Sequence, residues 1–405
     1  MRIKEICDFV SRGATPEYVD DSPFKVMNQA TFSKGWLDES NIRFTSKPAY
    51  DAQITKGDLL MASTGGGVLG KVFYFDKEDT CFYADSHVSI LRNSKGNHLM
   101  KFLYYYFLIR YEEINSTMVK GSTNQTELQR NYLLAYEINM PSLPVQQKIV
   151  DYLDEKTSAI DTQVELLEKK KDAYTRLKKA IINRAVTRGL DEHVKLKDSG
   201  VEWIGMIPEH WKVKRFKDVF RKYSTGFTPE SKNIDNFSDN EEFTWVTIAD
   251  MTTRVVGISN LNLSEKAIRD NMPVLTIKGS LMFSFKLTIG KTAFAEKDLY
   301  TNEAIVSIPP QRNVDLSFFY YTIPMICVNN ATENIYGAKM LNQKIIANML
   351  FAMPPYEEQQ AISSCLDKEC SKIDATIANI DKQTDALKRL KRSLINEVIT
   401  GQRAV

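Results

Sequence analysis

The feature that most constrains this chain is an internal repeat whose second copy lies 213 residues after the first. Residues 140–190 and 353–402 superimpose without a gap, and SRGATPE (11–17) falls on STGFTPE (224–230) at the same offset. The gapless match aligns Gln146-Gln147 with Gln359-Gln360, Leu153-Asp154 with Leu366-Asp367, Ile160-Asp161 with Ile373-Asp374, and Arg176-Leu177-Lys178 with Arg389-Leu390-Lys391. Self-similarity at a fixed offset marks a duplicated structural unit. The 405 residues therefore predict a tandem order of globular, helical, globular and helical parts.

Both repeated segments have the pattern of a long helix. Residues 145–188 contain neither Pro nor Gly, and apolar side chains recur every seven positions, which is typical of a coiled-coil seam. The seam residues are Leu153, Ile160, Leu167, Tyr174 and Ile181 in the first copy, and Leu366, Ile373, Ile380, Leu387 and Leu394 in the second. At 1.5 Å per residue, each helix of about 40 residues is roughly 60 Å long.

A seam of this length needs a partner, and the other copy in the same chain is the nearest one. Two related units are expected to pair as an antiparallel coiled coil about a pseudo-twofold axis. A homodimeric coiled coil remains the alternative. Polar seam positions, Lys171 with Thr384 and Lys178 with Lys391, weaken the contact but can fix its register.

The two globular parts share one texture of short β-rich stretches separated by polar turns, with one prominent helix each. The stretches are KVFYF (71–75), HVSIL (87–91), FTWVTI (243–248) and EAIVSI (303–308), and the helices are predicted at 98–114 and 314–330. This predicts an α+β fold. The expected boundaries are a first domain at 1–143, a central helix at 144–190, a linker at 191–212, a second domain at 213–356 and a C-terminal helix at 357–402.

Loops of both domains contain side chains that suit base edges or phosphates. Asn and Gln can pair with adenine, and Lys and Arg with guanine or phosphate, although such residues also populate ordinary turns. In the first domain the candidates are Asn28, Gln29, Ser63, Thr64, Lys71, Ser122, Thr123, Asn124 and Gln125. In the second they are Thr252, Thr253, Arg254, Lys286, Thr288, Lys291, Tyr336 and Lys339.

Several motifs of catalytic or metal-binding proteins are approached in this sequence, but each lacks a required residue or spacing. Gly65 to Lys71 fits the skeleton of a phosphate-binding P-loop, but Val72 stands where Ser or Thr must bind magnesium, so the segment is interpreted as a turn entering a strand. Neither the four histidines nor the five cysteines have metal-ligand spacing. Met-Pro-Pro-Tyr (353–356) lacks the polar residue of an adenine-methyltransferase signature. No catalytic residue and no metal site are therefore expected.

Composition adds modest limits. The chain is 43% hydrophobic and 26% charged with a net charge of +2, which neither demands nor excludes nucleic acid. No segment has the pattern of a signal peptide or a membrane span, so a soluble, cytoplasmic protein with no membrane partner is expected.

In combination, these residues resemble the specificity subunit of Type I restriction-modification enzymes. The resemblance rests on PxxxQQ before each long helix, on its Leu-Asp, Ile-Asp and Leu-Lys pairs, and on the stretch from Lys197 through Trp203 to Trp211. It covers essentially the whole chain. In one minor departure, the first domain starts at Met1 without a segment equivalent to 195–212.

The resemblance implies a non-catalytic subunit with two target-recognition domains, each reading one half of a split sequence in double-stranded DNA. The helices would set the gap between the halves and dock two modification subunits, while restriction subunits complete the complex. S-adenosylmethionine, ATP and magnesium would belong to those partners, and this chain would bind none. Two alternatives stay open: a related restriction-modification class with the same fold, and a coiled-coil scaffold whose globular ends bind protein.

Overall fold

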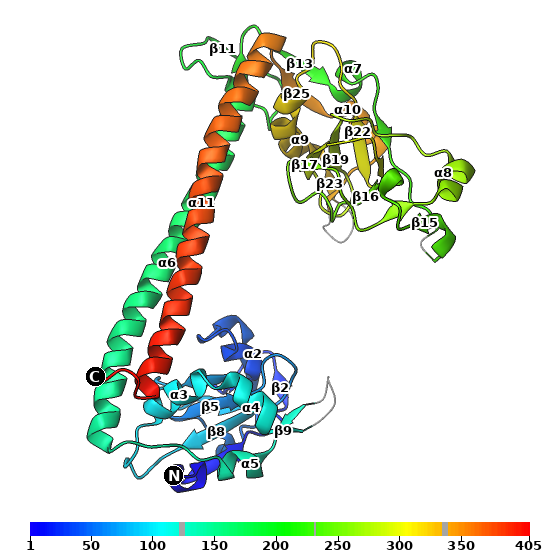
Figure 1. The fold of residues 1–405 in the computed structure, drawn as a ribbon. Coiled ribbons are helices and arrows are strands. Elements are labelled where there is room, and N and C mark those ends of the chain that lie inside the picture. The colour runs from blue at the N-terminus through cyan, green and yellow to red at the C-terminus, as the bar shows by residue number, and fades with distance from the viewer. Residues whose placement is uncertain (121–125, 231, 334–338) are drawn as a thin grey trace. The chain divides into compact units, whose positions relative to one another are not determined.

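The computed structural model describes residues 1–120, 126–230, 232–333 and 339–405, which form two compact units (Figure 1). Unit 1 combines Met1–Glu168 with Asp381–Val405, and unit 2 is Lys169–Ile380. Each unit therefore holds one globular domain together with a part of both long helices.

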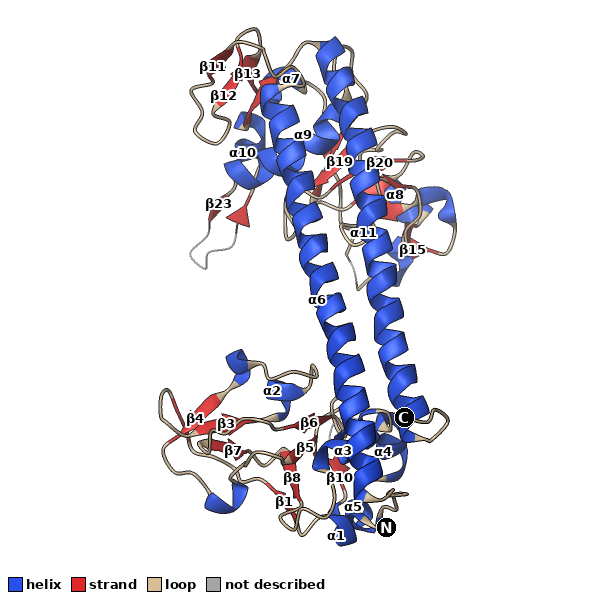
Figure 2. Ribbon diagram, turned by 90° about the vertical axis from the view of Figure 1, so that its left-hand side faces the viewer, coloured by secondary structure: helices blue, strands red, loops and turns tan. Residues whose placement is uncertain are grey.

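Two four-stranded sheets form the centre of unit 1 (Figure 2). The first has the antiparallel order β1-β8-β5-β6, and the second has the order β2-β4-β3-β7 with β3 and β7 parallel. Side chains alternate between the faces of β5, so Leu59 and Met61 enter one core while Leu60 and Ala62 enter another. The strands are β1 (Phe9–Arg12), β2 (Tyr18–Val19), β3 (Lys25–Met27), β4 (Arg43–Thr45), β5 (Leu59–Ala62), β6 (Val72–Tyr74), β7 (Phe82–Ala84), β8 (Val88–Arg92), β9 (Val119–Lys120) and β10 (Glu127–Leu128).

The helices of unit 1 correct one expectation. The single helix predicted at 98–114 is wrong, because the chain breaks at Ile109 and Arg110. The Arg110 amide donates to the carbonyl of Phe107 at 3.1 Å, and its guanidinium lies 4.6 Å from the Tyr106 ring centre, so the chain turns between two helices. The elements are α1 (Ile3–Ile6), α2 (Gln29–Phe32), α3 (Met100–Leu108), α4 (Tyr111–Thr117), α5 (Arg130–Ala135), and the 3₁₀ turns η1 (Glu39–Asn41) and η2 (Tyr50–Ala52).

Unit 2 repeats this plan around a five-stranded sheet of order β14-β22-β19-β20-β17. Helix α9 packs on β19 and β20, as α3 packs on β5 and β6 in unit 1. The helices and turns are α7 (Phe216–Val219), α8 (Glu265–Asn271), α9 (Leu316–Asn330), α10 (Gln343–Asn348), η3 (Ile234–Asn236) and η4 (Glu241–Phe243). The strands are β11 (Leu196–Asp198), β12 (Met206–Pro208), β13 (Lys212–Arg215), β14 (Ser224–Thr225), β15 (Phe237–Ser238), β16 (Trp245–Val246), β17 (Val255–Val256), β18 (Asn262–Leu263), β19 (Leu281–Ser284), β20 (Thr292–Ala295), β21 (Tyr300–Thr301), β22 (Ile305–Ile308), β23 (Thr332–Glu333), β24 (Lys339–Met340) and β25 (Leu350–Met353).

The long helices are α6 (Leu143–Arg188) and α11 (Tyr356–Ile399). In unit 1, Leu153 and Ile160 near the start of α6 share a core with Leu394 near the end of α11. In unit 2, Ala185 near the end of α6 shares a core with Leu366 near the start of α11. Both contacts require antiparallel helices, so the antiparallel pairing within one chain is confirmed. The sheets and helices of the two units confirm the α+β class.

Glycine is required at the repeated positions Gly13 and Gly226. A Cβ at Gly13 would lie 2.3 Å from the carbonyl oxygen of Ala84, and one at Gly226 would lie 2.0 Å from that of Thr301. Both contacts are backbone atoms, which cannot rotate away as a side chain could. Gly13 therefore passes so close to the turn before β8, and Gly226 so close to the turn before β22, that no side chain fits at either position.

We expect Gly13→Ala to lower the free energy of unfolding by roughly 1–3 kcal/mol, because the added methyl group overlaps fixed backbone. Thr15→Ala, at an exposed position two residues away, is the matched control and should be within about 0.5 kcal/mol of wild type. Thermal unfolding of the three proteins measures the difference. Equal stability of Gly13→Ala and wild type would contradict the close crossing.

Candidate nucleic-acid interface

In unit 1, the loop that follows β5 gathers several of the predicted residues. The Thr64 hydroxyl lies 2.6 Å from Nδ1 of His87 and 3.5 Å from Oε1 of Gln29, so segments far apart in sequence meet there. Ser63 is buried, with its hydroxyl 2.6 Å from that of Ser89. Asn28 caps α2, since its side chain accepts from the amide of Ala30 at 2.8 Å. The buried Thr64 thus joins the half-buried Gln29 to His87, while Ser63 and Asn28 hold the backbone.

The remaining candidates of unit 1 fall into two groups. Ser122, Thr123, Asn124 and Gln125 lie outside the described residues. The adjoining strand β10 contacts the β5 loop, because the Leu128 amide donates to the Ser63 carbonyl at 2.8 Å. Lys71 donates from Nζ to the Ser33 carbonyl at 2.9 Å. Val72 then begins strand β6, which confirms that the P-loop-like segment is a turn entering a strand.

The loop after β19 occupies the equivalent place in unit 2. Lys286 Nζ lies 3.8 Å from Oε1 of Glu303, and both side chains are 49% exposed. Lys291 Nζ donates to the Ile248 carbonyl at 2.8 Å, as Lys71 does to Ser33, so both lysines tie their loops to a neighbouring segment. Thr288 contributes its carbonyl to a bond from the Ser284 hydroxyl.

The other candidates of unit 2 are more scattered. Thr252 and Thr253 are exposed, and the Thr253 hydroxyl donates to the Val255 carbonyl at 2.7 Å. Lys339 is exposed in β24, with Nζ 3.4 Å from the Val328 carbonyl. Tyr336 lies outside the described residues. For every candidate of the two units, contact with DNA stays a prediction.

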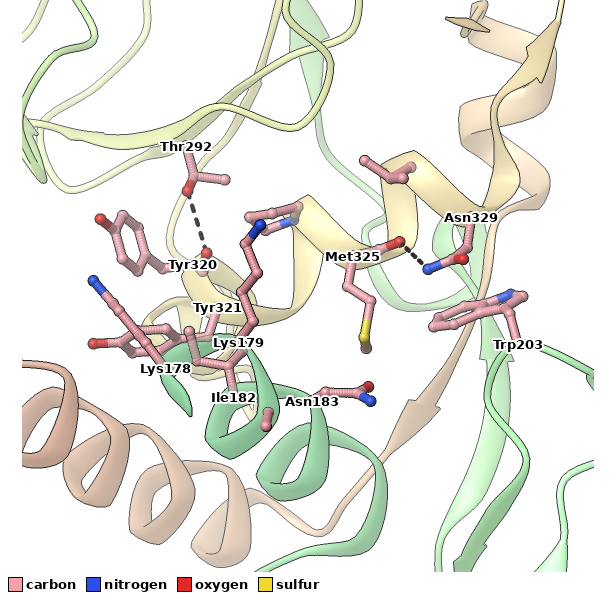
Figure 3. A pocket seen from close by; sticks show the side chains of 13 residues that line it. Lys178, Lys179, Ile182, Asn183, Trp203, Thr292, Tyr320, Tyr321, Met325 and Asn329 are labelled. Carbon is pink, nitrogen blue, oxygen red and sulfur yellow. Dashed lines mark hydrogen bonds between the residues drawn. The ribbon is translucent and has the colours of Figure 1, made fainter. Parts of the chain in front are cut away.

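A groove lies beside α9 and the end of α6 in unit 2, with a cavity volume of about 730 Å³ (Figure 3). Lys178, Tyr320 and Tyr321 line it, together with Met325 and Trp203. Unit 1 has a groove of about 710 Å³ against α3 and the start of α6, lined by residues that include Lys391, Tyr104, Tyr105, Asp154 and Asp161. The second lining is rich in carboxylates and the first is not, so the two grooves do not suit one common ligand.

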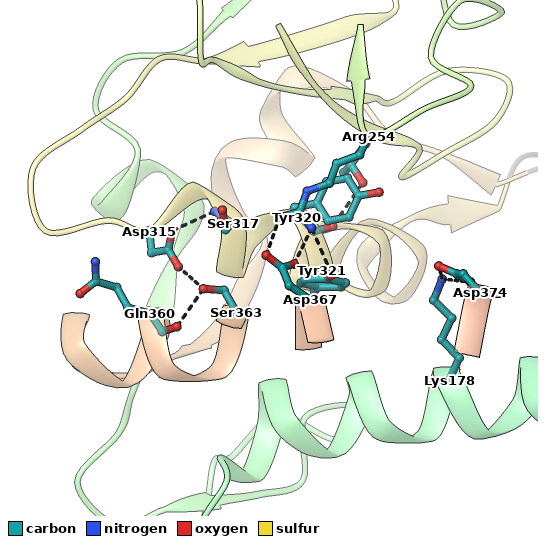
Figure 4. A network of polar contacts seen from close by, with 11 residues as sticks. Lys178, Arg254, Asp315, Ser317, Tyr320, Tyr321, Gln360, Ser363, Asp367 and Asp374 are labelled. Atoms are coloured by element: carbon teal, nitrogen blue, oxygen red, sulfur yellow. Dashed lines mark hydrogen bonds and ion pairs between the residues drawn. The ribbon is translucent and has the colours of Figure 1, made fainter. Parts of the chain in front are cut away.

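Arg254 points to the long helix instead of the loop surface (Figure 4). Its guanidinium forms an ion pair with Asp367 of α11, one nitrogen also contacts the Tyr321 hydroxyl at 3.3 Å, and the group stacks 4.7 Å from the Tyr320 ring centre. Both terminal nitrogens of the Arg254 guanidinium are therefore engaged within the protein. Contact between Arg254 and DNA remains untested, and we assign the residue a structural role.

The Asp367 contacts have a counterpart in unit 1, at the repeated residue Asp154. The Tyr105 hydroxyl donates to Asp154 at 2.7 Å and the Tyr321 hydroxyl donates to Asp367 at 2.6 Å. Burial is the main reason why the pKa of each tyrosine lies above its usual value, so both hydroxyls keep their protons and act as donors. Lys101, 2.7 Å from Asp154, takes the place of Arg254.

A second repeated contact involves the paired glutamines. Gln146 accepts from the Leu99 amide at 2.9 Å and donates to the Pro141 carbonyl at 2.8 Å. Gln359 accepts from the Asp315 amide at 2.9 Å and donates to the Pro354 carbonyl at 3.0 Å. Both side chains are buried. We call these aspartate and glutamine contacts the clasp, because they fasten each globular domain to the start of the helix that follows it.

We expect Arg254→Ala to lower the free energy of unfolding by about 1–2 kcal/mol. A half-exposed ion pair contributes up to about 1 kcal/mol, and stacking of the guanidinium on tyrosine adds a similar amount. The exposed Arg269 of α8 provides the control, and Arg269→Ala should be neutral within about 0.5 kcal/mol. Chemical denaturation measures both variants, and an unchanged midpoint for Arg254→Ala would argue against the clasp.

Within the described ranges, no three His, Cys, Asp or Glu side chains are grouped so that they could hold a metal ion. Across the same ranges, every helix is too short or too polar to cross a membrane.

The comparisons with known proteins agree on one family. Residues 1–173 and 208–389 match the Type I restriction modification DNA specificity domain. The putative type I restriction enzyme MjaX specificity subunit of Methanocaldococcus jannaschii is 22% identical over 99% of this chain and 92% of its own length. The MjaIX specificity subunit of the same organism is 26% identical over 47% of this chain and 44% of its own length.

Solved structures show the same fold. A chain from work on complex assembly and conformational transition of the type I R-M system superimposes with a TM-score of 0.74 at 15% identity, covering 98% of this chain and 96% of that one. The HsdS subunit from Thermoanaerobacter tengcongensis gives a TM-score of 0.53 at 15% identity, covering 100% of this chain and 96% of that one. Because the specificity-domain model matches two segments that cover most of the residues, this chain belongs to the family of Type I restriction-modification specificity subunits, the non-catalytic components of these systems.

Proposed function

We propose that this chain recognises a bipartite sequence in double-stranded DNA, with one half-site for each globular domain. The observation that carries the proposal is a contrast between two parts of the repeat. The clasp at Asp154 and Gln146 recurs at Asp367 and Gln359, whereas the loops after β5 and β19 differ in nearly every side chain. Two separate sequence readers require this combination of one shared support with different loops.

The test uses the full chain assembled with its modification subunits. We expect the complex to shift duplex DNA in an electrophoretic assay only when both half-sites are present, with weaker binding at higher salt because phosphate contacts release counterions. Methylome sequencing of host DNA with and without the gene then gives the target sequence. A continuous target, or binding without sequence preference, would contradict a bipartite reader.

We also propose that the long helices dock two modification subunits, with restriction subunits joining the same complex. The repeated residues Leu177 and Leu390 support two identical docking sites, because they lie outside the heptad seam and are 47% and 54% exposed. Exposed leucines at equivalent positions of both helices suit two copies of one partner. S-adenosylmethionine, ATP and magnesium would then be bound by these partners and not by this chain.

Replacing both leucines by glutamate tests this docking surface. We expect the Leu177→Glu/Leu390→Glu variant to bind modification subunits at least tenfold more weakly, since each buried leucine contributes roughly 1.5–3 kcal/mol to an apolar contact. Helix content by circular dichroism should be unchanged, because neither residue belongs to the seam. The matched control exchanges the exposed Arg176 and Arg389 for glutamine. Equal binding by the leucine variant and the control would exclude these positions from the interface.

A further inference from the structure

The two domains place different side chains on the same backbone arrangement, close to the loops after β5 and β19. Gly13 donates its amide to the Val88 carbonyl at 2.8 Å, and Gly226 donates to the Ile305 carbonyl at 3.2 Å. The turn before β8 is held by Asp85, which accepts from the His87 amide at 2.8 Å. In unit 2, Asn302 accepts from the Ala304 amide at 3.2 Å.

A third contact, between backbone groups, completes the match. The Ser63 amide donates to the His87 carbonyl at 2.8 Å, and the Phe285 amide donates to the Ala304 carbonyl at 3.0 Å. These three contacts pair the turn residues of the two units one by one. We call this shared arrangement the loop frame, and it consists of 12–13, 63–64 and 84–88 in unit 1 and 225–226, 285–286 and 301–305 in unit 2.

The side chains on the loop frame differ at equivalent positions. Thr225 replaces Arg12, Glu303 replaces Ser86, Ala304 replaces His87 and Lys286 replaces Thr64. In both units, however, a basic side chain lies beside a carboxylate. The guanidinium of Arg12 lies 3.4 Å from Glu127, with side chains 37% and 54% exposed, and Lys286 lies 3.8 Å from Glu303, with both side chains 49% exposed.

A neighbouring carboxylate decides what such a basic group can bind. It repels phosphate, which is negative, but tolerates base edges, which are neutral and offer both donors and acceptors. Arg12 is also fixed from behind, because its Nε donates to the Ser86 carbonyl. Its two terminal nitrogens lie 3.5 and 3.4 Å from Oε1 of Glu127, at the long limit of a hydrogen bond, so a base edge can replace these contacts. An arginine fork matches O6 and N7 of guanine, and a glutamate accepts from N4 of cytosine.

We propose that Arg12 and His87 determine the sequence read by the first domain, and that Glu303, with Lys286, determines the sequence read by the second. Arg12 recognises guanine in one half-site and Glu303 recognises cytosine in the other. The Asp85 or Asn302 turn presents these side chains at the same place in each domain. The inference rests on the proposed bipartite recognition and adds three residues, Arg12, His87 and Glu303, to the loop candidates found from sequence.

The test measures methylation of a library of DNA targets by the full chain assembled with its modification subunits. Arg12→Ala is expected to reduce modification of the wild-type target roughly tenfold to hundredfold. It should also relax the preference for guanine at one position of one half-site and leave the other half-site unchanged. Glu303→Gln should relax one position of the other half-site. Arg2→Ala is the matched control. Arg2 also pairs with a glutamate of unit 1, at 2.8 Å and with side chains 46% and 40% exposed, but it lies off the loop frame. The sequence preference of this variant should equal that of wild type.

Arg12→Lys keeps the positive charge but loses the two-pronged guanidinium, so it should also weaken the preference for guanine at that position. Thermal unfolding of this variant reports on its folding independently. The proposal is overturned if folded Arg12 variants keep the wild-type preference, or lose modification equally on all sequences as a phosphate contact would. These outcomes concern this inference alone, provided that the wild-type complex modifies a bipartite target. A wild-type complex with no bipartite target would instead overturn the proposed function.

Discussion

Exchange of residues 1–143 for the corresponding domain of another specificity subunit should replace one half of the recognised sequence and leave the other half unchanged. Unit 1 has its own cores, built from residues such as Leu59 and Leu60, and unit 2 has another around Phe283. A domain that carries its own core and its own loops can be replaced without disturbing the other reader. Methylome sequencing of cells that carry the chimera gives both half-sites directly.

The clasp sets the condition under which this exchange succeeds. The incoming domain must supply a tyrosine at the place of Tyr105 to donate to Asp154, and a backbone amide at the place of Leu99 to reach Gln146. A chimera with Phe at the tyrosine position is the control, and it should be less stable but read the same new half-site. A change in both half-sites would contradict the modular organisation, because it would mean that one domain alters the other.

The parts of the fold that follow from local periodicity could be predicted from the sequence. The seven-residue repeat placed both long helices, and α6 and α11 end within a few residues of the expected limits. The break at Ile109 and Arg110 was missed, because the apolar pattern runs through it without Gly or Pro. That turn is stabilised by the contact of Arg110 with Tyr106 and by its pair with Glu113, and a periodicity cannot show such contacts.

The candidate site was harder to predict, because its geometry depends on contacts between distant segments. A polar loop suggested that Arg254 faces DNA, but its partner Asp367 lies 113 residues later. Lys71 and Lys291 likewise donate to backbone carbonyls of distant segments. A signal for the loop frame was present in SRGATPE and STGFTPE, where glycine recurs at one fixed offset while the residue before it changes from Arg12 to Thr225.

Removal of one heptad from each long helix should shorten the gap between the half-sites without changing their sequences. Deleting 166–172 from α6 and 379–385 from α11 removes equivalent residues of the repeat and preserves the seven-residue seam. It also spares the clasp and the ion pairs of Lys178 with Asp374 and of Lys391 with Asp161, both 2.6 Å.

Seven residues of helix span about 10 Å, which corresponds to about three base pairs at roughly 3.4 Å each. The double deletion should therefore recognise the same half-sites with a gap about three base pairs shorter. Its affinity should be lower, because DNA must be twisted to bring both half-sites to the same face. Removing the heptad from α6 alone is the control, since unequal helices misalign the seam and should abolish a stable pair. Methylome sequencing measures the gap, and altered half-sites at an unchanged gap would show that the helices do not set the spacing.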